Sequence, residues 1–296
     1  MSTKTECPQF TEGTVSFVHG GETLHTYYKV YGQLEGRIHS PLVVLHGGPG
    51  LVHDYLFPFV DLADEYEIPV VLYDQLGNGK SSHIEGKEPA FWTIDLFIDE
   101  LVNLLSHLSI EDSFDLLGHS WGGILAAEFA ARRHPGLHRL VISNSVASPS
   151  LRQRSNAQLL EGFPEEVKIG IAEGMKNPPA YIRAVKEFHS VHGCLTRPLP
   201  GEYWYALDQI FGPDGDLTVA SAPALQRSSI IDRLHLIQVP TLVINGRNDF
   251  VQDFTVQPFL DKIPNVKWVT FENSSHTPFI EERSRYMKLL SNFLSA

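Results

Sequence analysis

The pentapeptide Gly118-His119-Ser120-Trp121-Gly122 places a serine in a G-x-S-x-G sequence. A short apolar run that favours a strand precedes it, and the apolar residues of 123–132 recur at helical spacing. At a strand-to-helix junction, this sequence predicts a nucleophile elbow, a turn so tight that only glycines fit beside the strained serine. We therefore predict that Ser120 is a nucleophile presented at the carboxyl edge of a sheet.

A serine hydroxyl needs a base to take its proton, and the base needs an acid that orients it. In chains with this elbow the order is serine, then Asp or Glu, then His. Asp249 and His276 each stand just past an apolar run that predicts a strand. We predict Ser120 as nucleophile, His276 as general base and acid, and Asp249 as the acid that fixes the imidazole tautomer. The rival acid, Asp253, is the better candidate for capping the next helix.

The glycine-rich stretch His46-Gly47-Gly48-Pro49-Gly50 follows another apolar run and predicts an oxyanion loop. A tetrahedral intermediate of acyl transfer carries an oxyanion that needs hydrogen-bond donors about 3 Å away. We predict the backbone N–H groups of Gly48 and Trp121 as these donors, because the proline of the loop has no N–H. Gly47 and His53 are further candidates for substrate contact.

These residues require a sheet whose strands end at one edge. Apolar runs alternate with helical patterns, which predicts an α/β fold with a mostly parallel, doubly wound, eight-stranded sheet. The predicted strands are an antiparallel hairpin of Thr14–His19 and Thr23–Tyr31, then Leu42–Leu45, Pro69–Tyr73, Phe114–Leu117, Arg139–Ser143, Thr241–Asn245 and Lys267–Phe271. The predicted helices between them are 93–108, 121–133, 256–262 and 281–294.

The alternation lapses between residues 147 and 236, where helical patterns at 165–173, 180–189 and 202–210 stand among many Pro and Gly residues. We predict a helical cap of residues 147–236 over a core formed by residues 1–146 and 237–296. This segment also holds an aromatic cluster, for which lining an apolar acyl pocket and packing the cap on the core both stay open. Its members are Tyr203, Trp204, Tyr205 and Phe211.

The composition limits the partners. A formal net charge of −12 repels phosphates, so nucleic acid and anionic membranes are not expected as partners. No apolar run approaches the roughly 18 residues of a membrane span, and residues 1–6 lack a signal core, which predicts a cytoplasmic protein. Cys7 and Cys194 are too few for a disulfide framework or a zinc cluster. We expect no metal and no cofactor, and the oligomeric state stays open.

Three motifs occur in the order His46–Gly50, Asp74-Gln75-x-Gly77-x-Gly79-x-Ser81 and Gly118–Gly123. With the cap segments Phe188–Cys194 and Phe211–Pro213, they make the chain resemble the prolyl aminopeptidase (proline iminopeptidase) family of α/β-hydrolases over nearly its whole length. The resemblance implies a peptidase that removes an N-terminal residue, or a related amidase or esterase, without a metal or cofactor.

The chain departs from this family at positions that would read the substrate. The family recognises a free α-amino group with acidic side chains, but the matching positions here are Gly215 and Phe250. Without a carboxylate, a buried ammonium group lacks the ion pair that offsets its desolvation. Asp214 or Asp216 could substitute through a shifted loop. Leu76 stands where the family usually carries Arg.

The sequence thus predicts a serine hydrolase that cleaves a small amide, peptide or ester through an acyl-enzyme, with a proline iminopeptidase-like activity as the family default. The alternative is an amidase, esterase or thioesterase that acts on a small specialised metabolite without a free N-terminal amine. A remote alternative is a non-catalytic protein that binds a small apolar ligand on the same fold. The complete set of Ser120, Asp249 and His276 disfavours this last hypothesis.

Overall fold

The computed structural model describes residues 9–84, 86–227 and 229–296 of the chain. These residues contain an eight-stranded sheet in the order β1-β2-β4-β3-β5-β6-β7-β8. The strands are β1 (Phe10–His19), β2 (Glu22–Tyr31), β3 (Leu42–Leu45), β4 (Val70–Tyr73), β5 (Phe114–His119), β6 (Leu137–Ser143), β7 (Thr241–Gly246) and β8 (Val266–Phe271). The first two pairings, β1 with β2 and β2 with β4, are antiparallel, and the others are parallel. The predicted fold class is confirmed. Residues 1–8, which include Cys7, lie outside the described residues.

The central strands are mainly apolar because both faces of the sheet are covered. Every residue of β3, β4 and β5 is buried. Successive side chains point to opposite faces, so Val43 and Leu45 join one core cluster while Leu42 and Val44 join the other. In the edge strand β1, buried and exposed residues alternate instead from Thr14 to Val18.

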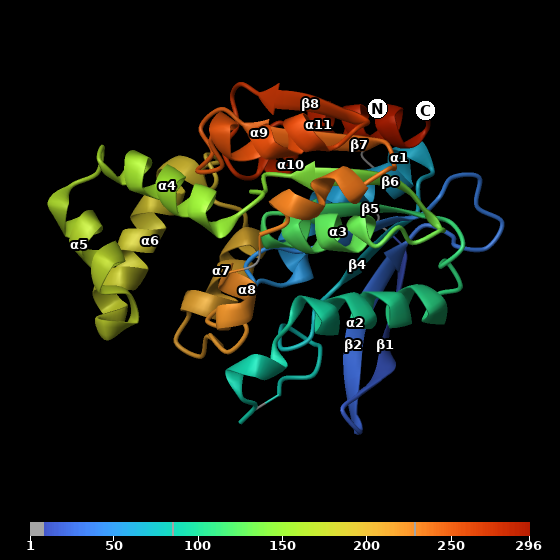
Figure 1. The fold of residues 1–296 in the computed structure, drawn as a ribbon, viewed down its shortest axis with the longest axis horizontal. Coiled ribbons are helices and arrows are strands. Elements are labelled where there is room, and N and C mark those ends of the chain that lie inside the picture. Colours follow the sequence, from blue (N-terminus) through green and yellow to red (C-terminus); the bar gives the residue numbers. More distant parts are fainter. Residues whose placement is uncertain (1–8, 85, 228) are drawn as a thin grey trace.

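Helices cover both faces (Figure 1). The α-helices are α1 (Asp61–Tyr66), α2 (Ile94–His107), α3 (Trp121–Ala131), α4 (Pro149–Leu160), α5 (Glu165–Glu173), α6 (Pro178–His192), α7 (Gly201–Phe211), α8 (Pro223–Arg227), α9 (Asp253–Lys262), α10 (Pro278–Glu281) and α11 (Arg283–Leu294). The 3-10 helices are η1 (His53–Val60), η2 (Pro89–Phe91), η3 (Gly174–Lys176) and η4 (Ile231–Leu236). Residues of α2, α3 and α9 pack on one face, and residues of η1, α1 and α11 pack on the other. In the described parts of the chain, no helix is long and apolar enough to cross a membrane.

Helices α4 to α8 occupy the chain between β6 and β7, and Figure 1 shows α4, α5 and α6 projecting beyond one side of the sheet. The helical patterns correspond to α5, α6 and α7. The sequence reasoning missed α4, because only Ser155 of this helix is buried and no apolar periodicity marks it. Its signal is a capping one: the Ser148 side chain accepts from the N–H of Leu151, and Pro149 opens the helix. The exact cap boundaries stay a prediction.

Candidate active site

The chain turns sharply between β5 and α3, with Ser120 at φ 55° and ψ −118°. This conformation is strained for a residue with a side chain. The flanking glycines are required by close approach. A Cβ atom on Gly118 would lie 2.0 Å from the carbonyl oxygen of Gly122, and one on Gly122 would lie 2.3 Å from that of Leu45. The backbone therefore has the turn that the G-x-S-x-G sequence predicts.

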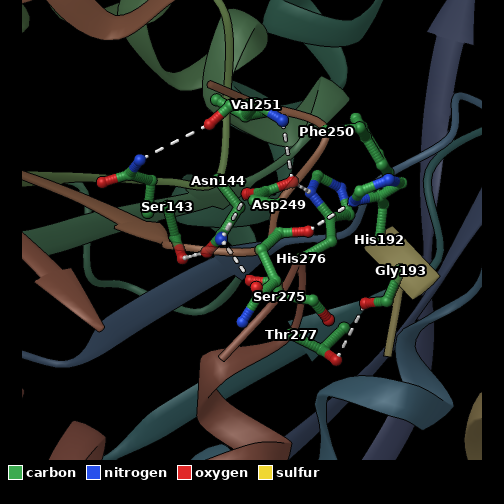
Figure 2. Close-up of polar contacts among 12 residues, drawn as sticks. Ser143, Asn144, His192, Gly193, Asp249, Phe250, Val251, Ser275, His276 and Thr277 are labelled. Atoms are coloured by element: carbon green, nitrogen blue, oxygen red, sulfur yellow. Dashed lines mark hydrogen bonds and ion pairs between the residues drawn. The ribbon is translucent and has the colours of Figure 1, made fainter. Parts of the chain in front are cut away.

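Asp249 and His276 meet although they follow different strands, β7 and β8. His276 Nδ1 lies 2.8 Å from Asp249 Oδ1, and both side chains are buried (Figure 2). Asp253 does not compete for this contact. It lies in the first turn of α9, and its carboxylate lies 2.7 Å from Arg247 Nη1.

Burial controls the protonation of this pair. It lowers the pKa of His276, so the imidazole is neutral near pH 7. It also raises the pKa of Asp249, against the opposite effect of the N–H of Val251 and the amide of Asn144. Because Asp249 takes Nδ1, the nitrogen left for chemistry on His276 is Nε2.

Asn144 is a site residue that the sequence reasoning missed. Its Nδ2 donates to Asp249 Oδ2 at 2.7 Å and to the carbonyl of Ser275 at 3.2 Å, so it holds the loops of both the acid and the base (Figure 2). It is buried and adopts a left-handed conformation, φ 52°, directly after β6. A polar residue at the end of an apolar strand was the available signal.

The end of α6 contacts the same two loops. His192 Nδ1 donates to the carbonyl of Asn248 at 2.8 Å, next to Asp249. The hydroxyl of Thr277 donates to the carbonyl of Gly193 at 3.2 Å (Figure 2). The end of α6 therefore stabilises the loops that carry Asp249 and His276, the predicted acid and base.

The residue before Ser120, His119, connects the elbow to the loop of His276. His119 Nε2 lies 2.9 Å from the carbonyl oxygen of His276, and the two imidazole rings are 4.7 Å apart. Within the described residues, the hydrogen bonds of His276 run to Asp249 and His119 and not to Ser120 Oγ. Contacts between a nucleophile and its base often tighten only when substrate binds.

The predicted oxyanion loop is anchored by Gln75. Its N–H donates to His46 Nε2, its side-chain amide donates to the carbonyl of His46, and its Oε1 accepts from Trp121 Nε1, each at 3.0 Å. Burial lowers the pKa of His46 to about 4, so this imidazole is neutral and its Nδ1–H donates to the carbonyl of Gly47 at 3.0 Å. The next peptide N–H, that of Gly48, points to the opposite side because the peptide is trans. The network thus fixes the orientation of one predicted oxyanion donor.

Comparisons with known proteins agree with this geometry. The profile of the alpha/beta hydrolase fold matches residues 40–283. A proline iminopeptidase of Clostridioides difficile (strain 630) is 32% identical, over 97% of this chain and 99% of the relative. One of Saccharolobus solfataricus is also 32% identical, over 92% and 89%. The chain belongs to the proline iminopeptidase family of α/β-hydrolases.

Solved structures support the same assignment. The crystal structure of VinJ is 38% identical with a TM-score of 0.89, over 96% of this chain and 98% of that one. The proline iminopeptidase of Mycobacterium smegmatis is 34% identical with a TM-score of 0.84, over the same shares. The resemblance inferred from the motifs is confirmed, and the chain is a proline iminopeptidase-like hydrolase.

Two departures from the proline iminopeptidase pattern have a structural basis. The ring of Phe250 packs on the imidazole of His276, with centroids 3.9 Å apart. A Cβ atom on Gly215 would lie 2.3 Å from the carbonyl oxygen of Ile210, so this loop has no room for a side chain there. Asp216 contacts His83 Nδ1 at 3.0 Å and the N–H of Thr218 at 2.8 Å. Neither family position therefore presents a carboxylate.

The predicted aromatic cluster is not a single surface. Tyr203 is buried against Tyr55, with ring centroids 6.2 Å apart, whereas Tyr205 is 49% exposed. Trp204 lies under Lys186 Nζ at 4.8 Å. Consecutive residues of a helix point about 100° apart, so 203–205 cannot face one pocket. The fourth member, Phe211, packs on Tyr181 with centroids 6.2 Å apart.

His53 has an internal partner. Its Nδ1 and its backbone N–H each lie 2.8 Å from Asp74 Oδ1, and the side chain is buried. This contact joins the start of η1 to the loop after β4. His53 Nε2 is buried without a hydrogen-bond partner among the described residues, and substrate contact by His53 stays a prediction. No three His, Cys, Asp or Glu residues of the described chain lie close enough to hold a metal ion.

Leu76, where the proline iminopeptidase family usually carries Arg, is joined to a buried acid. Its N–H donates to Glu100 Oε1 at 3.0 Å, and the hydroxyl of Thr26 donates to the same oxygen at 2.7 Å. Burial raises the pKa of Glu100 from 4.5 to about 8. Folded Glu100 is therefore mainly protonated at pH 7, whereas in the unfolded chain it is ionised.

This shift predicts a pH-dependent stability. Between pH 4.5 and 8 the folded state binds up to one more proton at Glu100 than the unfolded state does. The free energy of unfolding therefore falls as the pH rises through this range, by up to about 1.4 kcal/mol per pH unit. Glu100→Gln mimics the protonated acid and removes this contribution. In urea unfolding at pH 5 and pH 8, we expect the variant to gain stability relative to wild type at the higher pH. Parallel pH profiles would contradict the shift, and Asp99→Asn, an exposed neighbour, is the control.

Proposed function

We propose that this protein is a serine hydrolase that cleaves a small amide, peptide or ester through an acyl-enzyme on Ser120. The observation that carries the proposal is the buried hydrogen bond of 2.8 Å between His276 Nδ1 and Asp249 Oδ1. Burial keeps the imidazole neutral, and the hydrogen bond through Nδ1 leaves Nε2 to act as the base. His119, which contacts the carbonyl of His276, directly precedes the strained Ser120 at the start of a helix. This is the arrangement that an activated serine requires.

In the acylation step, Ser120 Oγ attacks the carbonyl carbon and forms an O–C bond while its proton passes to His276 Nε2. The carbonyl oxygen becomes an oxyanion, which the N–H groups of Gly48 and Trp121 stabilise. Asp249 stabilises the imidazolium that forms. When the intermediate collapses, the C–N or C–O bond breaks and His276 donates its proton to the leaving amine or alcohol.

Deacylation repeats these roles with water. The oxygen of a water molecule attacks the acyl carbon while His276 Nε2 takes a proton from that water. Collapse of the second intermediate returns the proton to Ser120 Oγ and releases the acid. Atoms and charges balance without a cofactor.

A fluorophosphonate probe tests this proposal, because it phosphonylates only an activated serine. We expect stoichiometric labelling of the wild type, with the modification on the peptide that contains Ser120. Lack of labelling, or labelling at another residue, would refute the proposed mechanism.

A second candidate substrate class is favoured by the Phe250 ring on His276. An aromatic ring at this position offers no negative charge to a free α-amino group, and Gly215 itself offers none either. Of the two carboxylates beside Gly215, that of Asp216 pairs with His83. The site then acts as an amidase, esterase or thioesterase on a small metabolite that lacks a free N-terminal amine. Phe250 would contact the apolar part of that substrate.

A substrate panel separates the two classes. If Phe250 forms an apolar wall, N-acetyl-prolyl p-nitroanilide should have a kcat/KM at least about tenfold above that of prolyl p-nitroanilide, which has the same leaving group, since a missing hydrogen bond to a charged group costs about 1.5–3 kcal/mol. Phe250→Glu should shift the preference toward the free amine, with Phe254→Glu on α9 as the matched control. A strong wild-type preference for the free-amine anilide would establish the peptidase activity instead.

A further inference from the structure

An unbroken line of hydrogen bonds connects the oxyanion loop to the loop of the catalytic histidine. The N–H of Gly47 donates to the hydroxyl of Tyr55 at 2.7 Å, and this hydroxyl lies 2.7 Å from His119 Nδ1. His119 Nε2 then lies 2.9 Å from the carbonyl oxygen of His276. All three links are buried. The line passes beside Ser120, which directly follows His119.

The chemistry at the two ends fixes the direction of every hydrogen bond. A carbonyl oxygen only accepts, so His119 Nε2 must carry a hydrogen. Burial and the neighbouring His276 lower the pKa of His119 to about 3, so the imidazole is neutral and its Nδ1 is bare. The hydroxyl of Tyr55 must therefore donate to Nδ1. Its oxygen is left to accept from the N–H of Gly47.

We propose that Tyr55 is a positioning residue that acts through His119 to hold the oxyanion loop and the base in register with Ser120. Its hydroxyl sets the orientation of the Gly47 peptide, which directly precedes the predicted donor Gly48. Through His119 it also fixes the carbonyl of His276. The Gly47 backbone lies close to both residues: a Cβ atom on Gly47 would lie 3.0 Å from Ser120 Cβ and 3.1 Å from the Tyr55 oxygen. This close packing restricts how the Gly47 peptide can be oriented.

Aromatic residues of α7 and α10 pack against the ring of Tyr55. Tyr55 lies in η1, is fully buried, and packs against Tyr203 of α7 and Phe279 of α10 with ring centroids 6.2 and 6.0 Å apart. Packing on both sides restricts the ring, so the hydroxyl is preorganised between its two partners. Preorganisation of this kind matters for rate, since a displacement of about 1 Å can cost about 100-fold.

The first test is Tyr55→Phe, which removes only the hydroxyl. We expect kcat and the second-order rate of fluorophosphonate labelling to fall by about 10- to 100-fold, while KM changes less than about threefold. Tyr73→Phe is the matched control, because the Tyr73 hydroxyl is also buried but has no hydrogen-bond partner in the described chain. Thermal unfolding of both variants accounts for any unfolded fraction. A wild-type labelling rate in folded Tyr55→Phe would overturn the role of Tyr55.

A double-mutant cycle tests whether Tyr55 and His119 act together. In His119→Gln the amide NH₂ can take the position of Nε2 and donate to the carbonyl of His276, but the side chain has no acceptor atom at the position of Nδ1, where the Tyr55 hydroxyl binds. If the two residues form one chain, Tyr55→Phe/His119→Gln should be about as slow as the slower single variant. Multiplied effects would show independent roles and would overturn the proposal.

Nitrogen-15 NMR of histidine-labelled protein tests the direction without any turnover. We expect the His119 signal, assigned by its loss in His119→Gln, to report the Nε2–H tautomer; the Nδ1–H tautomer would overturn the proposed direction. The positioning role rests on the proposed function, but the two fail differently. If the wild type is not labelled by the probe, both are refuted. If it is labelled and Tyr55→Phe reacts equally fast, only the role of Tyr55 is refuted.

Discussion

Ser120→Ala is expected to lower kcat by about 10⁶-fold and to abolish fluorophosphonate labelling, because removal of the nucleophile eliminates the acyl-enzyme. The fold should survive, since the backbone contacts that shape the elbow remain: the N–H of residue 120 donates to the carbonyl of Ser143 at 2.9 Å. Alanine also fits the space between Gly118 and Gly122. The measurement is kcat on the best substrate of the panel, together with probe labelling.

Ser145→Ala is the matched control for this prediction. Ser145 is buried close to the elbow, and its hydroxyl has no hydrogen-bond partner in the described residues. We expect its kcat to stay within about threefold of wild type, as for a change that removes no catalytic group. Labelling that persists in Ser120→Ala would mean that another residue is the nucleophile.

Asp249→Asn is expected to lower kcat by about 10⁴-fold while KM changes little. Asn144 and the N–H of Val251 both donate to the carboxylate, at 2.7 and 2.9 Å. An amide at this position can satisfy one of these donors only with its oxygen, so its NH₂ group is directed at another donor or at His276 Nδ1. An NH₂ group at the Oδ1 position donates to His276 Nδ1, which moves the imidazole hydrogen to Nε2 and removes its basicity. An NH₂ group at the Oδ2 position meets the Asn144 amide, a second donor, and the negative charge that stabilises the imidazolium is lost. The pH dependence of kcat/KM and the labelling rate measure this loss.

Asp253→Asn is the matched control, because it makes the same change at the rival acid. Asp253 pairs with the exposed Arg247, and such surface pairs contribute little to stability. We expect less than about a twofold change in kcat. A larger effect of Asp253→Asn than of Asp249→Asn would reverse the assignment of the acid.

The sequence alone was sufficient to predict the strands of the sheet and the order of the candidate site residues along the chain. Strands buried on both faces are apolar runs, and such runs are visible without a structure: Leu42–Leu45 coincides with β3. Because parallel strands end at one edge, the residues just past β5, β7 and β8 could be placed together. His276 pairs with Asp249 rather than Asp253 because Asp249 lies in the loop directly after β7, whereas Asp253 lies in the first turn of α9.

The supporting residues could not be predicted, since their contacts join distant parts of the chain. Asn144 and Asp249 are 105 positions apart, and Tyr55 and His119 are 64 apart. Nothing in their local sequence specifies these partners. For the same reason His53 could not be recognised as a partner of Asp74, and the aromatic residues 203–205 were grouped although a helix directs them apart.

Trapping the acyl-enzyme tests the central claim most directly. Wild-type protein is mixed with p-nitrophenyl acetate, quenched during the burst, digested and examined by mass spectrometry, with Ser120→Ala in parallel. The proposed mechanism predicts one released p-nitrophenol per active site in the burst and one acetyl group on the peptide that carries Ser120. An acetyl group elsewhere with Ser120 unmodified, or the same rate of turnover in Ser120→Ala, would contradict it.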